Sequence, residues 1–284
     1  MTDELQKKVD RAIRLLQSIK YKDNEPIEIA YSGGKDSDVI LELARMAGIH
    51  YRAIYKCTTI DPPGTIKHCK ENGVEIVRPK QTFFELVQKN GMPNMFMRFC
   101  CGVLKEYPIL YNVVIGVRKS ESRRRNARYN EPVVCRVYNK SKNSRVQQIL
   151  PLLDWTDDEE LGFIEERGIK LHPLYYCEDG SIDIKRRLGC MCCPLKYYKK
   201  RIEDFKAHPR MLRQYVRNAA KYMNTHPNSS ARKWANSVYE YVYAEIMFSR
   251  HSDFMKEFKN GGQQYSARFF KETLEREFGV DLNI

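Results

Sequence analysis

The sequence lacks several features that would assign a chain to a class at once. It has no run of about eighteen or more apolar residues and no charged-then-apolar leader, so neither a membrane span nor a secretory signal is predicted and a cytoplasmic protein is expected. It also has no internal repeat and no low-complexity linker. Its 284 residues can bury a sizeable core but are few for two full-sized domains. We therefore expect one main domain with an appendage.

Acidic residues are too few to balance the basic ones. The chain has 36 Asp and Glu against 49 Lys and Arg, a formal net charge of +13. The excess is concentrated in residues 118–128 and 185–221. Such a field attracts polyanions, which include nucleotides, RNA and DNA. A solvated basic face without a partner is the alternative interpretation.

The cysteines are odd in number, which is unlike a disulfide scaffold. Nine cysteines in a leaderless chain of this size favour reduced thiols. Five of them fall in two tight clusters, Cys100-Cys101 and Cys190-Met-Cys192-Cys193. Two pairs of thiolates form a soft four-sulfur site that suits an iron–sulfur cluster or zinc, with Cys192 as the spare thiol. Buried cysteines that never meet a metal are the alternative.

Strand-like and helix-like segments alternate through the first part of the chain. Strands are predicted at residues 27–31, 51–58, 74–77 and 112–117, and helices at 1–20, 65–72 and 83–89. This alternation predicts a parallel sheet with helical crossovers. An inserted loop or hairpin is expected at residues 129–150, and a helix capped by Thr156 follows it. From residue 197 to about 277 the pattern predicts helices.

Residues 32–37, Ser-Gly-Gly-Lys-Asp-Ser, stand between a predicted strand and a predicted helix. A glycine pair lets the backbone turn so that several N–H groups point one way, and the helix start adds a positive dipole. Lys35 adds a charge, Ser32 and Ser37 can donate hydrogen bonds, and Asp36 suits a magnesium ion or the helix cap. The segment therefore predicts a phosphate site, with an ordinary glycine-rich turn as the alternative.

These six residues resemble the pyrophosphate loop of the adenine nucleotide alpha-hydrolase superfamily and lack the longer spacing of a Walker loop. Further motifs resemble the phosphoadenosine phosphosulfate reductase family, in the family's order. They are Cys-Cys-x-x-Leu-Lys-x-x-Pro at residues 100–108, Gly-Val-Arg-x-x-Glu-Ser at 116–122, Leu-Asp-Trp-Thr at 153–156, His-Pro-Leu-Tyr at 172–175 and Gly-Cys-x-x-Cys-Pro at 189–194. The resemblance spans about residues 25–200.

The resemblance implies an α/β, Rossmann-like fold with a parallel sheet, in a nucleotide-binding domain at residues 1–196 followed by a helical extension at 197–284. It implies ATP or an adenylyl sulfonucleotide, Mg²⁺ and a [4Fe–4S] cluster, with zinc the less favoured metal. The residues expected to bind the nucleotide are Ser32, Gly33, Gly34, Lys35, Asp36, Ser37, Asp61, Lys105 and Arg118. Those expected to act in catalysis are Lys35, Asp36, Arg118 and Arg123, and the expected metal ligands are Cys100, Cys101, Cys190 and Cys193.

Two departures from the family pattern bear on the reaction. The sequence has no cysteine after Cys193, whereas assimilatory reductases carry a nucleophilic cysteine near the C-terminus. Residues 58–63 replace the family's usual Asp-Thr-Gly. Members with a cluster and without that cysteine resemble the ATP pyrophosphatases of DNA phosphorothioation and the tRNA thiolases. We therefore expect ATP-dependent sulfur transfer with release of pyrophosphate.

Two alternatives stay open at this point. One is a phosphoadenylyl- or adenylyl-sulfate reductase that uses another thiol, and the other is a nucleotide- or nucleic-acid-binding regulator without activity. The expected partners are an adenine nucleotide, DNA or tRNA, and a cysteine desulfurase or other sulfur donor. No membrane partner is expected.

Overall fold

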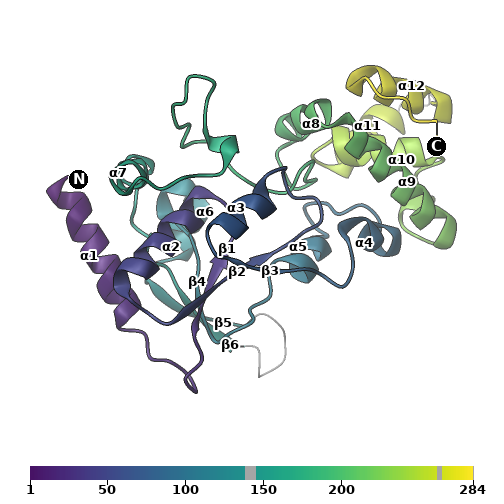
Figure 1. Ribbon diagram of the computed structural model, residues 1–284. Helices are drawn as coiled ribbons and strands as arrows, with labels where there is room; N and C mark the ends of the chain where they lie inside the picture. Colours follow the sequence, from purple (N-terminus) through teal and green to yellow (C-terminus); the bar gives the residue numbers. More distant parts are fainter. Residues whose placement is uncertain (138–144, 261–263, 284) are drawn as a thin grey trace. The chain divides into compact units, whose positions relative to one another are not determined.

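A six-stranded sheet organises the first part of the chain in the computed structural model, which describes residues 1–137, 145–260 and 264–283 (Figure 1). The strands are β1 (Ile27–Tyr31), β2 (Tyr51–Lys56), β3 (Glu75–Val77), β4 (Asn112–Val114), β5 (Val133–Val137) and β6 (Arg145–Ile149). Their order is β3-β2-β1-β4-β6-β5, and every pair is parallel except β5 with β6. The predicted α/β fold with a mostly parallel sheet is confirmed.

The helices connect the strands in the first part of the chain and dominate the rest. They are α1 (Asp3–Gln17), α2 (Lys35–Ala47), α3 (Thr65–Glu71), α4 (Phe83–Asn90), α5 (Phe99–Leu104), α6 (Arg123–Arg128), α7 (Asp157–Arg167), α8 (Tyr198–Ala207), α9 (Pro209–Thr225), α10 (Val238–Met247), α11 (His251–Phe258) and α12 (Ala267–Phe278). None of the helices in the described ranges is long and apolar enough to cross a bilayer.

Two compact units divide the chain. The first comprises residues 1–57, 61–78 and 106–189, and the second comprises 58–60, 79–105 and 190–284. The sheet belongs to the first unit, while α4, α5 and α8 to α12 belong to the second. The domain boundary at residue 196 stays a prediction.

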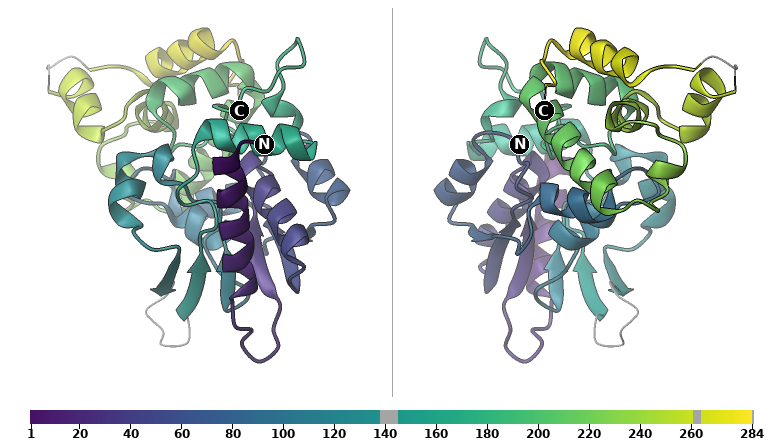
Figure 2. Two further views of the ribbon diagram at one scale, coloured as in Figure 1. Left: turned by 90° about the vertical axis from the view of Figure 1, so that its left-hand side faces the viewer. Right: turned by 90° about the vertical axis from the view of Figure 1, so that its right-hand side faces the viewer.

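The core of the first unit forms between the sheet and its helices. Helix α1 buries Leu5, Val9, Ala12 and Leu16, one side of an amphipathic helix, and packs against α2 (Figure 2). Helix α2 ends at Gly48, whose φ of 62° suits a residue without Cβ. Strand β1 lies between β2 and β4, so the residues that follow it stand at the middle of the sheet's carboxyl edge.

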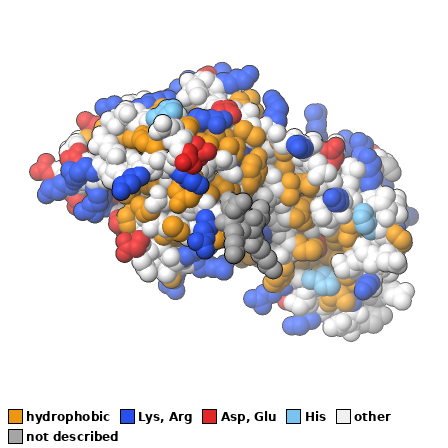
Figure 3. All heavy atoms as spheres, turned by 90° about the horizontal axis from the view of Figure 1, so that it is seen from below, with side chains coloured by type: hydrophobic (Ala, Val, Ile, Leu, Met, Phe, Trp, Pro, Cys, Tyr) orange, Lys and Arg blue, Asp and Glu red, His pale blue; other side chains and the backbone are white. Residues whose placement is uncertain are grey.

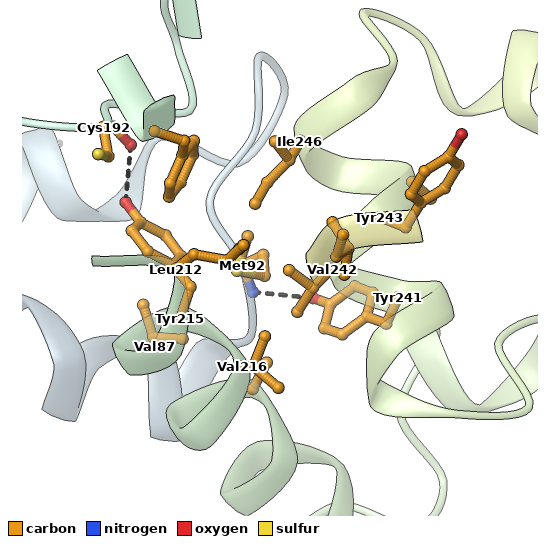
Figure 4. Packing of buried hydrophobic residues seen from close by; sticks show 14 of the residues in the cluster. Val87, Met92, Cys192, Leu212, Tyr215, Val216, Tyr241, Val242, Tyr243 and Ile246 are labelled. Atoms are coloured by element: carbon orange, nitrogen blue, oxygen red, sulfur yellow. Dashed lines mark hydrogen bonds between the residues drawn. The ribbon is translucent and has the colours of Figure 1, made fainter. Parts of the chain in front are cut away.

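The second unit is held together by aromatic packing. Phe83 and Phe205 contact Tyr215 edge-on, with ring centroids 5.6 and 5.3 Å apart. The buried tyrosine hydroxyls have hydrogen-bond partners. Tyr215 donates to the Cys192 carbonyl at 2.9 Å, and Tyr241 accepts from the Met92 N–H at 2.8 Å (Figure 4). Helix α10 packs on α9 and α12 in this core.

The predicted insertion at residues 129–150 contains the antiparallel pair β5 and β6, which confirms the hairpin, although residues 138–144 lie outside the described residues. Strand β4 is shorter than predicted. It ends at Val114, because Ile115 to Val117 turn away to a segment in which Gly116 approaches α2.

Candidate functional site

The predicted phosphate loop lies between β1 and α2, as expected. Gly33 has a φ of 77° and Gly34 is the N-cap of α2. A Cβ on Gly33 would lie 3.1 Å from Leu188 Cδ2 and 3.2 Å from Thr65 Cγ2. At Gly34 it would lie 3.2 Å from the Tyr175 hydroxyl. These contacts are tighter than most Cβ contacts, and the positive φ of Gly33 itself favours glycine.

Side-chain hydroxyls brace the loop. Ser37 donates to the Gly34 carbonyl at 2.6 Å, and the Gly34 N–H donates to Ser32 Oγ at 3.3 Å. The Tyr175 hydroxyl accepts from the Lys35 N–H at 3.2 Å and from the Leu188 N–H at 3.3 Å. One hydroxyl therefore connects the start of α2 to a segment that reaches Cys190 two residues later.

Lys35 is buried against a carboxylate. Its Nζ lies 2.6 Å from Glu160 Oε2, and its side chain is only 5% exposed. Glu160, on α7, is fully buried. A carboxylate partner offsets part of the cost of burying a cation. Lys35 is thus held at the loop in a fixed direction.

Arg118 is the second buried cation of the site. Its guanidinium lies 2.7 Å from Asp36 Oδ1, 2.7 Å from Asp157 Oδ1 and 3.1 Å from Glu160 Oε2. Burial opposes its charge, but the carboxylates of Glu160 and Asp36 outweigh burial and raise the pKa of Arg118. Arg118 therefore joins the loop to α7.

Gly116 explains how Arg118 comes so close to the loop. A Cβ at this position would lie 2.7 Å from Asp36 Cβ, nearer than real Cβ atoms approach one another. The Gly-Val-Arg sequence thus lets the backbone touch α2 and deliver the guanidinium to Asp36.

The other residues predicted for nucleotide binding have different places. Asp61 lies in the first unit between β2 and α3, and together with burial it raises the pKa of Tyr55. Arg123 is exposed at the start of α6. Lys105 belongs to the second unit, where it lines a cavity with the cysteines. The structure thus brings residues 32–37 and Arg118 together.

The four predicted metal ligands line one small cavity in the second unit. Cys100 and Cys101 come from α5, and Cys190 and Cys193 come from the segment before α8. Thr58, Ile60, Phe83 and Pro194 complete most of the wall. The two cysteine pairs, nearly ninety residues apart in sequence, therefore meet in the fold.

The thiols of this cavity are close enough to raise one another's pKa. A hydrogen bond to Cys101, burial and the nearby Cys193 raise the pKa of Cys100. Burial, Cys190 and Cys101 raise the pKa of Cys193. Four thiols are a soft donor set that suits zinc or an iron–sulfur cluster. Within the described residues, no three His, Cys, Asp or Glu side chains are already arranged as a metal-binding group.

Cys192 lies apart from that cavity wall. It is fully buried in the apolar core, and burial raises its pKa to about 12 (Figure 4). Its backbone is fixed on both sides, because its N–H donates to Asp204 at 3.1 Å and its carbonyl accepts from Tyr215. Its φ of 49° turns the chain sharply between Cys190 and Cys193.

A buried arginine holds the chain just after the cysteines. Arg201 donates to the carbonyls of Pro194 at 2.8 Å, Ile246 at 2.7 Å and Phe248 at 2.8 Å. The Cys193–Pro194 turn is thereby tied to the end of α10. No ion pair of Arg201 with a carboxylate occurs within the described ranges.

Sequence reasoning missed Glu160 and Asp157, which complete the loop's charge cluster. The signal was present, because Thr156 caps α7 and its first turn holds four acidic residues. Acids in a first turn are common as partners of the helix dipole, so the pattern did not separate Glu160 from the exposed acids beside it.

A sheet with a phosphate loop after its central strand defines an α/β nucleotide-binding domain. The phosphoadenosine phosphosulfate reductase domain model matches residues 26–196. The chain belongs to this family.

Two uncharacterized proteins of Methanocaldococcus jannaschii are similar to the chain. One is 25% identical over 199 residues, which is 64% of this chain and 39% of the relative. The other is 26% identical over 227 residues, which is 75% of this chain and 52% of the relative. The chain therefore spans about half or less of the length of these relatives.

Two solved structures are also similar. The phosphoadenylyl-sulfate reductase of Candida auris, in a phosphate complex, has a TM-score of 0.45 and 16% identity, covering 67% of this chain and 96% of that one. The U34-tRNA thiolase NcsA of Methanococcus maripaludis, with its [4Fe–4S] cluster, has a TM-score of 0.43 and 18% identity, covering 81% and 82%.

Proposed function

We propose that this chain uses ATP, with release of pyrophosphate, to activate a nucleic-acid acceptor for sulfur transfer. The observation that carries the proposal is one chain holding two sites. Lys35 and Arg118 stand buried at a phosphate loop, and four thiols line one cavity. The predicted cytoplasmic location, where thiols stay reduced, agrees with this chemistry.

The residues of the loop fit the first step. In the proposed reaction, an acceptor oxygen attacks the α-phosphorus of ATP and pyrophosphate leaves. Backbone N–H groups at the start of α2 and the charges of Lys35 and Arg118 would stabilise the negative charge that develops on the leaving phosphates. Asp36 would hold a magnesium ion, which would supply positive charge to the leaving pyrophosphate.

Cys100, Cys101, Cys190 and Cys193 would hold the cluster. A bound [4Fe–4S] cluster would supply a site at which sulfur from a cysteine desulfurase or other donor is received and passed on. Lys105 lines the same cavity and would place a positive charge beside the thiolates.

The basic surface supports a polyanionic acceptor. Arg123, Arg124 and Arg128 are exposed on α6. Lys and Arg side chains are also spread widely over the face drawn in Figure 3, where acidic side chains are fewer. Such a surface neutralises phosphate groups without reading sequence.

The thiol chemistry gives less support to a reductase. Attack on a sulfonucleotide requires an accessible thiolate outside the metal site. Burial raises the pKa of Cys69 and of Cys192 to about 12, which keeps both thiols protonated at neutral pH. Neither is suited to act as the nucleophile, so a reductase reaction would need Cys57, Cys135 or Cys177.

The test is an anaerobic assay of pyrophosphate release from ATP, with and without DNA or tRNA and a sulfide donor. We expect release that depends on the acceptor, together with sulfur incorporated into it. Arg124→Ala and Arg128→Ala should weaken the response to nucleic acid, most strongly at low salt, without changing nucleotide affinity. Sulfite formed from a sulfonucleotide without ATP turnover would choose the reductase, and ATP binding without any turnover would choose a regulator.

A further inference from the structure

The charges that pair directly at the phosphate loop do not sum to a positive value. Two cations, Lys35 and Arg118, face the three carboxylates of Asp36, Asp157 and Glu160. If all five groups are ionised, the cluster carries one net negative charge. An anion with several charges would then bind where the local field repels it. Arg125 and Arg187 also act on Asp36 and Asp157, and they share the carboxylate of Glu121. A proton on one carboxylate of the cluster would make the site more favourable for a nucleotide.

Glu160 is the carboxylate in the least favourable place for a charge. It is fully buried, whereas the side chain of Asp36 is 24% exposed and that of Asp157 is 45% exposed. Its Oε2 contacts Lys35 and Arg118, but its Oε1 is buried without a hydrogen-bond partner. An ionised buried oxygen without a donor is costly, and a proton on it removes that cost.

The groups around Glu160 shift its pKa in opposite directions. Burial and the Asp36 carboxylate raise the pKa of Glu160 to about 7, although Lys35 and Arg118 oppose the rise. Asp157 is different, because its contact with Arg118 outweighs partial burial and lowers its pKa. On α7 itself, the neighbouring Glu159 pairs with Lys8 of α1 at 2.7 Å. The contacts with Lys35 and Arg118 are therefore what favour the ionised form of Glu160.

A phosphate group would compete for those same two cations. Once Lys35 and Arg118 donate to phosphate oxygens, Glu160 loses much of the attraction that holds its charge. It also gains a nearby anion, which disfavours the charge further. We infer that nucleotide binding at this loop takes up a proton from solvent onto Glu160. The carboxylate becomes a neutral acid, and no bond other than this O–H forms or breaks.

This inference rests on the proposed nucleotide site and deepens it. Glu160 is a positioning residue, since it acts through Lys35 and Arg118. Before a nucleotide binds, the Glu160 carboxylate pairs with both cations and holds their side chains at the loop. Above neutral pH it competes with the nucleotide, so affinity should fall as pH rises.

Calorimetric titration with the Mg²⁺ complex of α,β-methylene ATP tests the inference. At pH 8, titrations in buffers of different ionisation enthalpy measure protons bound per nucleotide. We expect an uptake approaching about one proton for the unmodified chain and an affinity that tightens by up to about tenfold per unit as pH falls toward 7. Glu160→Gln should take up almost none and bind with little pH dependence. The matched control Glu159→Gln should behave as the unmodified chain.

The outcomes separate the two proposals. Binding without proton uptake by the unmodified chain would overturn the role of Glu160 and leave the nucleotide site standing. The same uptake in a folded Glu160→Gln variant would also overturn it. Absence of nucleotide binding at every pH would overturn the proposed function itself. Because the first outcome needs no variant, the inference stays testable even if Glu160→Gln fails to fold.

Discussion

The phosphate loop and the cysteine cavity differ in how their buried polar groups are stabilised. At the loop, each buried cation has a carboxylate partner, as in the contact of Lys35 with Glu160. At the cavity, burial and neighbouring sulfurs raise the pKa of Cys100 and Cys193, and no described group there forms a metal site by itself. In the proposed function, the first site must exchange partners to bind an anion. The second needs a cation that draws the protons from its thiols.

The largest effect is expected at the cavity. Cys193→Ser removes one of four sulfur donors, and bound metal should fall by more than about tenfold. Metal analysis of protein purified without oxygen measures this change. Cys135→Ser, on an exposed thiol of β5, is the control and should keep its metal. Full metal content in the Cys193 variant would refute the assignment of this ligand.

At the loop, Lys35→Ala should weaken nucleotide binding by roughly 10- to 100-fold, because a charged hydrogen bond to phosphate is lost. Glu160 keeps its contact with Arg118 at 3.1 Å, so we expect the variant to fold. Calorimetry measures affinity and circular dichroism checks folding. Lys8→Ala, which removes another lysine paired with a glutamate of α7, should leave affinity unchanged. Unaltered affinity in Lys35→Ala would mean that the loop does not bind phosphate.

Two glycines sharpen the comparison between the units. Gly116→Ala would force a Cβ to within 2.7 Å of Asp36 Cβ and should lower the free energy of unfolding by about 1–3 kcal/mol. Gly102 lies in α5 with no atom within 4 Å of its added Cβ, so Gly102→Ala should be neutral or stabilise by up to about 1 kcal/mol. Denaturant unfolding compares them. Equal losses would contradict the close packing of Gly116.

The smallest effect concerns the hydroxyl that braces the loop. Tyr175→Phe leaves the N–H groups of Lys35 and Leu188 without their acceptor and should cost about 1–2 kcal/mol. Tyr176→Phe removes an acceptor from one N–H, that of Leu171, and should cost less. Thermal unfolding of both variants measures the difference. A larger loss for the second variant would contradict the bracing role.

Much of the fold could be predicted because local signals agreed with tertiary packing. The Thr156 cap of α7, the strand before the loop and the N-terminal helix α1 each have a local physical cause. The end of β4 was predicted three residues too late, since the apolar run continues while the backbone turns. What stops the strand is the approach of Gly116 to Asp36, a contact between distant segments.

The sequence predicts which kinds of residue form the candidate sites, but not every side chain that contacts them. The glycines before Lys35 and the paired cysteines predict a phosphate site and a soft metal site, and the structure brings each set of residues together. Glu160 was not identified, because a glutamate in a helix becomes special only when the fold buries it. Lys105 was assigned to the nucleotide by motif, while the structure places it with the cysteines.

The most direct measurement is iron, acid-labile sulfide and visible absorbance of the chain purified without oxygen. A [4Fe–4S] cluster on Cys100, Cys101, Cys190 and Cys193 predicts about four iron and four sulfide per chain and a brown colour. One zinc per chain and no sulfide, or no metal at all, would contradict the proposal that these four thiols hold a cluster.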